Sequence, residues 1–281
     1  EVGPFIENVS YDGIVVTVDG FSDRTIGFPE TLQGTADSDR VEIFNASTGG
    51  GTQLLDVLAA GGDDTITATG SSVRAFGENG RDRFVFGTDG SMSASGGSGN
   101  DTFALSEFTL LGMNVNGNGG TDLLVAERTR LMVVDLNTAG EIENAVVSSH
   151  ESLLALQVVG TSANNEITLI TSQGGGLVTV RGGDGEDTIT GGDGNDRLHG
   201  EGGDDLIRGG AGDDTLRGGD GSDTLAGEAG RDKLYGDGGD DLLIARRGSR
   251  DRVDGGEGTD SATLDQGPDI LDIAISIESV L

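Results

Sequence analysis

A large apolar residue, or alanine at the last position, returns at nine-residue intervals through residues 182–263. The row begins with Ile189 and ends with Ala262, and one extra residue, Ala245, shifts it once. Side chains alternate between the two faces of a strand, so each apolar residue should point inward while its two neighbours point outward. The pattern predicts a stack of short strands around a thin aliphatic row.

Between these strands the chain is acidic and rich in glycine, which permits the tight turns that a short repeat requires. The units read GGDGEDTIT, GGDGNDRLH, GEGGDDLIR, GGAGDDTLR, GGDGSDTLA, GEAGRDKLY, GDGGDDLLI, RRGSRDRVD and GGEGTDSAT. The sixth residue of every unit is aspartate, at positions Asp187, Asp196, Asp205, Asp214, Asp223, Asp232, Asp241, Asp251 and Asp260.

These units closely resemble the RTX (repeats-in-toxin) nonapeptide GGxGxDxUx, in which U is a large apolar residue. The resemblance covers residues 182–263, about a third of the chain. It implies an all-β fold, a parallel β-solenoid of the haemolysin-type calcium-binding β-roll kind. In such a roll two nonapeptides form one turn, and calcium ions lie between successive turns along both edges.

Aspartates two repeats apart would stack in this roll, Asp187, Asp205, Asp223, Asp241 and Asp260 along one edge and Asp196, Asp214, Asp232 and Asp251 along the other. Stacked carboxylates repel one another unless a cation lies between them. Calcium suits such turns because it accepts about six or more oxygen ligands, whereas magnesium demands a tighter octahedron. We expect several ions, on the order of five to ten, and folding coupled to their binding. The alternative is an acidic, flexible glycine linker.

Weaker versions of the acidic turn occur in the N-terminal half, where they end in Asp64, Asp82, Asp101 and Asp122. The half-turns between them lack an acidic loop near Gly70, Gly87 and Gly112. This spacing predicts a degenerate β-solenoid with calcium on one edge only. The larger residues expected to fill its wider core include Phe84, Phe86 and Phe103. Ordinary Asp-Gly turns without metal are the alternative.

Two blocks of the chain align with each other. GTADSDRVEI at 34–43 resembles GTSANNEITL at 160–169, and each leads through GGG, at 49–51 or 174–176, towards an acidic turn. A tandem duplication explains these matches. The predicted organisation is N-terminal cap strands at 1–33, including GIVVTVDG at 13–20, a degenerate solenoid block at 34–150, a second block at 151–263 that contains the RTX array, and a C-terminal cap at 264–281. Caps are expected because solenoid ends expose strand edges and core.

Charge narrows the range of partners. The 281 residues include 49 Asp and Glu against 17 Lys and Arg, for a formal charge of −32. Self-repulsion of this size calls for cations and argues against nucleic acid as a partner. The absence of cysteine excludes disulfides and thiolate metal sites. No stretch approaches the roughly 20 apolar residues of a membrane span.

Candidate catalytic groups are scarce, and no enzymatic activity is expected. The two histidines, His150 and His199, are interpreted as surface residues, and neither G-x-S-x-G nor H-E-x-x-H occurs. On the even repeats the outward residues are Arg197, His199, Thr215, Arg217, Lys233, Tyr235, Arg252 and Asp254. On the odd repeats they are Thr188, Thr190, Leu206, Arg208, Thr224, Ala226, Leu242 and Ile244. One face is thus basic and the other half apolar; the cations could balance local repulsion or contact an anionic partner.

The sequence therefore predicts a noncatalytic calcium-binding structural protein, extracellular or at the cell surface, that self-associates into a filament, surface layer or matrix. The resemblance implies export by type I secretion in an unfolded state and folding in external calcium. The alternative is a calcium-folded binding module or adhesin fragment that recognises an anionic polysaccharide through Arg197, Arg217, Lys233, Tyr235 and Arg252.

Overall fold

The computed structural model describes residues 7–11, 14–19, 31–33, 36, 38–45, 54–69, 72–87, 92–106, 113–129, 133–136, 142–149, 155–171, 177–245, 250–265 and 273–280. Several features named above lie outside these residues: Gly70, Gly112, His150 and the glycine runs at 49–51 and 174–176. The regular secondary structure of the described residues consists of strands, without a helix. Two compact units are present, unit 1 (1–130 and 138–142) and unit 2 (131–137 and 143–281). The predicted domain boundaries stay a prediction.

Unit 1 contains strands of two sheets. One sheet has the order β1 (Glu7–Tyr11), β2 (Ile14–Asp19), β4 (Arg40–Asn45), β6 (Thr65–Thr69), β8 (Arg83–Phe86), β10 (Thr102–Ser106) and β12 (Leu123–Thr129). The other has the order β3 (Thr31–Gln33), β5 (Leu54–Leu58), β7 (Ser72–Asn79), β9 (Met92–Ser98) and β11 (Met113–Gly119). Strand β2, from the predicted cap segment 13–20, pairs antiparallel with both β1 and β4. The pairings from β4 to β12 are parallel.

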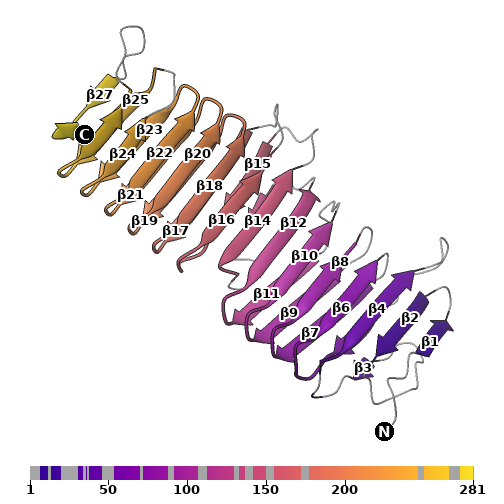
Figure 1. Ribbon diagram of the computed structural model, residues 1–281. Coiled ribbons are helices and arrows are strands. Elements are labelled where there is room, and N and C mark those ends of the chain that lie inside the picture. Colours follow the sequence, from indigo (N-terminus) through magenta and orange to yellow (C-terminus); the bar gives the residue numbers. More distant parts are fainter. Residues whose placement is uncertain are drawn as a thin grey trace. The chain divides into compact units, whose positions relative to one another are not determined.

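Unit 2 repeats the two-sheet arrangement, with consecutive strands alternating between the sheets (Figure 1). One sheet contains β14 (Asn144–Ser149), β16 (Glu166–Ile170), β18 (Thr188–Asp193), β20 (Leu206–Ala211), β22 (Thr224–Ala229), β24 (Leu242–Ala245), β26 (Ser261–Leu264) and β28 (Ser279–Val280). The other contains β13 (Val133–Asp135), β15 (Ala155–Val159), β17 (Leu177–Asp184), β19 (Arg197–Gly202), β21 (Thr215–Asp220), β23 (Lys233–Gly238), β25 (Arg252–Glu257) and β27 (Ile273–Ile275).

The register confirms a parallel β-solenoid in which residues two repeats apart stack. Ile189 lies beside Ile207, and Leu198 lies beside Leu216. Within the array, the strands extend beyond the apolar residue and its two neighbours, because the first residues of the next repeat continue the pairing. Gly192, for example, still pairs with Gly210. The acidic turn is therefore short and sits tightly against its neighbours.

The core of each unit follows the predicted apolar rows. In unit 2 the side chains of the repeat row are fully buried: Ile189, Leu198, Ile207, Leu216, Leu225, Leu234, Leu243, Val253 and Ala262. In unit 1 Phe84, Phe86 and Phe103 are also fully buried, among aliphatic side chains such as Ile43 and Ile66. The rings of Phe84 and Phe103 stack with centroids 4.9 Å apart. The described core of unit 1 thus contains aromatic rings, whereas the repeat row of unit 2 is aliphatic.

The described residues contain no helix that is long and apolar enough to cross a membrane.

Candidate metal-binding turns

Every aspartate predicted from the repeats is buried at the base of its turn, directly before a strand. The exposed fraction is 3% or less for Asp64, Asp82, Asp101, Asp122, Asp187, Asp196, Asp205, Asp214, Asp223, Asp232, Asp241, Asp251 and Asp260. A buried carboxylate is costly unless it has partners. The polar contacts of these groups therefore decide what the turns can do.

In unit 2 the odd repeats build one ladder of hydrogen bonds, which we call the first edge. The main-chain N–H of each aspartate donates to Oδ1 of the aspartate one turn further along the chain. Asp187 donates to Asp205, Asp205 to Asp223, Asp223 to Asp241 and Asp241 to Asp260, with N to Oδ1 distances of 2.8–2.9 Å. The predicted stacking of these five residues is present.

The even repeats form the second edge in the same way. Asp196 donates to Asp214, Asp214 to Asp232 and Asp232 to Asp251, at 2.8–2.9 Å. Asp196 differs from the rest because its own Oδ2 accepts the N–H of Gly192, at 3.2 Å, within the same turn. The two predicted rows of unit 2 are thus present, one directly before the strands of each sheet.

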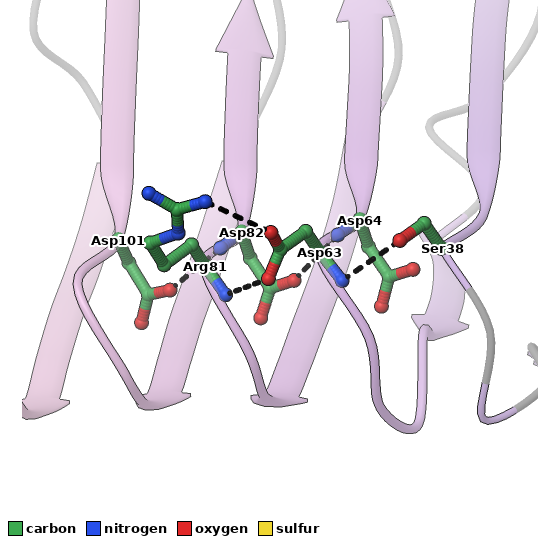
Figure 2. Close-up of polar contacts among 6 residues, drawn as sticks. All are labelled: Ser38, Asp63, Asp64, Arg81, Asp82 and Asp101. Atoms are coloured by element: carbon green, nitrogen blue, oxygen red, sulfur yellow. Dashed lines mark hydrogen bonds and ion pairs between the residues drawn. The ribbon is translucent and has the colours of Figure 1, made fainter.

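Unit 1 has an acidic edge of the same construction (Figure 2). The N–H of Asp64 donates to Asp82, that of Asp82 to Asp101 and that of Asp101 to Asp122, each at 2.8 Å. The N–H of Asp39 begins the row by donating to Oδ1 of Asp64, at 2.6 Å. The four predicted aspartates of the N-terminal half therefore lie in one row.

The ladders leave one buried oxygen of most carboxylates without a hydrogen bond. Within the described part of the chain, no donor reaches Oδ2 of Asp64, Asp82, Asp101, Asp187, Asp205, Asp214, Asp223, Asp232, Asp241 and Asp260, or Oδ1 of Asp196. An ionised oxygen that is both buried and unbonded carries a large desolvation cost. Such a repeated row of oxygens needs either protons or a cation.

Burial raises the pKa of ten carboxyl groups of the ladders, and loss of hydration is the largest cause at each; main-chain N–H donors oppose it in part. The pKa rises to about 8 for Asp214 and to about 7 for Asp64, Asp187 and Asp241. It rises to about 6 for Asp82, Asp196, Asp205, Asp223 and Asp232. The pKa of Asp101 is raised as well. Near neutral pH the rows are therefore poised between protonated and ionised forms.

In the turn of Asp205, a carboxylate oxygen and a main-chain oxygen lie near each other beside a glycine. A Cβ on Gly200 would lie 1.8 Å from Oδ2 of Asp205 and 2.8 Å from the main-chain oxygen of Gly218 in the next turn. Both are the hard oxygen donors that calcium prefers. Among the described residues, no three acidic, histidine or cysteine side chains gather into a metal-binding group. Main-chain carbonyls would complete the ligand set, which suits calcium.

A second ladder, which the repeat pattern does not reveal, runs along the exposed tips of the turns. The fifth residue of a turn accepts through its side chain the N–H of the fifth residue one turn further on. Ser222 donates to Asp204, Thr259 to Asp240 and Asp213 to Asn195, each at 2.8 Å. In unit 1 one such pair is Arg81 and Asp63, whose side chains also form an ion pair (Figure 2). The sequence signal for this second ladder was an asparagine or aspartate at the fifth position of a turn.

The first edge has non-aspartate residues at its two ends, which the repeat pattern also missed. At one end the N–H of Asn165 donates to Oδ1 of Asp187, at 2.7 Å. At the other the N–H of Asp260 donates to Oε2 of Glu278, at 2.6 Å. The alignment of the two blocks contained a signal for Asn165, because it places that residue opposite Asp39.

The outward faces carry the predicted residues, and acidic neighbours pair with several of the cations. Arg217 binds Asp237 at 2.9 Å and lies over the ring of Tyr235, 4.6 Å from its centroid. Arg252 lies 3.7 Å from Asp254. Burial is the largest cause of a lowered pKa at His199, and neighbouring arginines add to it. The half-buried His199 is consistent with an outward position on the sheet.

The fold and the stacked acidic turns define a parallel β-solenoid of the β-roll class. The family model of the RTX calcium-binding nonapeptide repeat, which comprises four copies, matches residues 58–90, 181–216 and 217–250. The chain thus carries RTX calcium-binding repeats, and one matched segment lies in unit 1, around Asp64 and Asp82. No curated protein matches the chain.

Proposed function

We propose that this protein is a secreted, noncatalytic structural protein whose β-roll folds when calcium binds, and that it forms part of an extracellular filament, surface layer or matrix. The observation that carries the proposal is the row of buried carboxylate oxygens without donors along the edges of the roll. These oxygens belong to aspartates that would each contribute to a calcium site, together with main-chain carbonyls of the glycine turns. Bound calcium would neutralise the stacked carboxylates, so that binding and folding become one event.

All thirteen aspartates of the ladders are proposed as calcium ligands, in unit 1 as well as in unit 2. Secretion by a type I route accords with this chemistry, because the charge of −32 would keep the chain expanded where calcium is scarce. A role in assembly is supported by apolar side chains on the last two described strands. Ile273, Ile275 and Val280 are 43%, 38% and 54% exposed, and exposed apolar strands favour association.

Light scattering after size exclusion, in chelator and in millimolar calcium, tests this proposal. The expected result is an expanded monomer in chelator that becomes a high-mass assembly in calcium. A compact monomer in calcium would support calcium-dependent folding and contradict assembly. A chain whose size is the same in both buffers would contradict the calcium switch itself.

A second candidate function, recognition of an anionic polysaccharide, is favoured by a hollow of about 790 Å³ in unit 2. Arg197 and Lys233 line it together with Asn195, Leu177 and three carboxylates, Asp193, Asp196 and Asp213. Within the described residues neither cation has an ion-pair partner, whereas Arg217 and Arg252 of the predicted set do. The two cations would attract an acidic sugar once bound calcium offsets the charge of the three carboxylates.

Binding of a uronate polymer in calcium would distinguish this candidate. The double variant Arg197→Gln with Lys233→Gln should then lose binding, while Arg208→Gln, which removes an exposed cation from the opposite sheet, should retain it. Retained binding in the double variant, or no binding by the unaltered protein, would contradict the polysaccharide function.

A further inference from the structure

The first edge of unit 2 begins with an amide where every later turn has a carboxylate. Asn165 is the sixth residue of its turn, is 3% exposed, and donates its main-chain N–H to Asp187 as the aspartates donate to one another. Its main-chain oxygen accepts the N–H of Thr188, at 2.8 Å, as that of Asp187 accepts the N–H of Leu206. In its backbone contacts, Asn165 is therefore a regular member of the ladder.

The side chain of Asn165 makes contacts that a carboxylate could not make. Its Oδ1 accepts the N–H of Thr161, at 2.7 Å. Its Nδ2 donates to the main-chain oxygen of Glu143 in the preceding turn, at 2.8 Å, and to Oγ1 of Thr161, at 3.0 Å. The oxygen of Glu143 can only accept, so the atom that faces it has to be the donor nitrogen. Both hydrogens of the amide are thereby used.

The contrast with Asp187, one turn later, is in charge and not in shape. Asparagine and aspartate have the same outline, yet Oδ2 of Asp187 is buried without a donor, as noted for the ladder. At Asn165 a nitrogen bearing hydrogens supplies the positive partner for the neighbouring oxygens. In the acidic turns a cation would have to supply it.

Neutral hydrogen bonds hold the rest of this turn. The hydroxyl of Thr161 accepts the N–H of Ala163, at 3.1 Å. The side chain of Asn164 accepts the N–H of Glu186, at 3.0 Å, in the second ladder. No carboxylate occurs from residue 160 to residue 165. Strand β16, which follows the turn, pairs with β14 over five residues, and the two strands bury Ala145, Val147, Ile167 and Leu169.

We infer that the Asn165 turn is metal-independent: its side-chain amide does the work that a calcium ion does in the acidic turns. Strands β14 and β16 then stay paired when calcium is withdrawn, and β16 is the template on which β18 and the later strands assemble when calcium returns. The inference rests on the proposed calcium dependence of the array that follows.

Hydrogen exchange followed by mass spectrometry on the full chain, in calcium and in chelator, tests the inference. In the unaltered protein residues 143–170 should stay protected in both buffers. The variant Asn165→Asp should exchange about tenfold faster there in chelator, because a buried carboxylate oxygen then lacks a partner. Calcium should restore its protection, and equilibrium dialysis should find additional bound calcium.

Asn164→Asp is the matched control, because it adds the same charge one residue earlier at an exposed side chain that keeps its acceptor oxygen. Its exchange in chelator and its calcium content should equal those of the unaltered protein. A second variant, Thr161→Val, removes the hydroxyl that accepts from Asn165 and should speed exchange in chelator without adding bound calcium.

Two results would overturn the inference: rapid exchange of residues 143–170 in chelator in the unaltered protein, or the same protection in Asn165→Asp as in the unaltered protein. Failure of the proposed function would appear elsewhere, as protection of residues 182–263 that does not depend on calcium. The two outcomes are read from different peptides of one experiment.

Discussion

Units 1 and 2 are both two-sheet β-solenoids, but they differ in their buried apolar side chains and in the number of their acidic edges. Unit 1 has one described acidic edge and stacks Phe84 on Phe103 inside. Unit 2 has two acidic edges and a row of single aliphatic side chains. Aromatic rings bury more apolar surface than aliphatic side chains in the same places, and fewer buried carboxylates oppose that gain in unit 1. The unit with less buried apolar surface and more buried carboxylates, unit 2, should therefore depend more strongly on calcium.

Removal of calcium should produce the largest difference in stability between the two units. In chelator, limited proteolysis should cut first within residues 182–263, because both edges of that array hold buried carboxylates. A fragment that contains β6, β8 and β10 should survive longer, and mass spectrometry would identify it. Equal cleavage of both units in chelator would contradict the proposed difference.

Acid should partly replace calcium. A carboxyl group whose folded pKa lies above its unfolded value stabilises the fold fully below the unfolded pKa, and this stabilisation is lost as the pH rises through the folded pKa. The ordinary pKa of an aspartate side chain is 3.8, and the pKa values in the fold lie from about 6, as at Asp205, to about 8 at Asp214. The calcium-free chain should therefore gain β-structure, measured by circular dichroism, as the pH falls from about 8 to about 5.

The upper part of that pH window belongs to Asp214, whose pKa is raised to about 8. Asp214→Asn should leave less structure to be gained between about pH 8 and pH 7. Calcium binding should respond in the opposite sense, because protons compete with calcium for the same oxygens. A calcium-free chain that loses β-structure on mild acidification would contradict the account of the buried carboxylates.

A core substitution should destabilise unit 1 alone. Phe103→Ala removes a fully buried ring from the stack with Phe84 and should lower the free energy of unfolding of unit 1 by about 3–5 kcal/mol. Calorimetry in calcium should show the transition of unit 1 at lower temperature and that of unit 2 unchanged. Phe103→Leu keeps more of the volume and should cost less; an equal cost for the two variants would argue against the ring stack as the cause.

The smallest expected difference is between two neighbouring aspartates of one turn. Asp205→Asn removes a charge from the buried ladder and should raise the calcium concentration at half-folding by about tenfold. Asp204→Asn removes the same charge from the exposed tip, keeps an acceptor for Ser222, and should change that midpoint by less than about twofold. A calcium titration followed by circular dichroism measures both. Equal shifts would mean that burial does not distinguish the two ladders.

Most of the fold was predictable because the repeat is short and regular. The spacing of Ile189, Leu198 and their successors fixed the inward row, and stacking two repeats apart placed the aspartates on their edges, as the register confirms. The longer strands were missed because glycines such as Gly192 have low strand preference, yet here they pair with glycines of the next turn.

The hydrogen bonds between neighbouring turns were harder to predict from the sequence. Which carboxylate oxygen receives the N–H of the neighbouring turn depends on side-chain orientation, and no spacing rule encodes it. Asn165 and Glu278 were missed as ladder members because neither is aspartate, although their main-chain or side-chain atoms extend the row. The ligand role of the aspartates and the number of ions stay predictions.

The stacking of residues two repeats apart also bears on how such a gene can grow. Loss or gain of a full turn of 18 residues, the interval between Asp187 and Asp205, returns every later strand to its own sheet. Loss or gain of a single nonapeptide would exchange the two sheets for every later strand and set the basic face against the half-apolar one. Slippage of the coding DNA by pairs of repeats is therefore structurally silent, and the array can change length while its faces keep their chemistry.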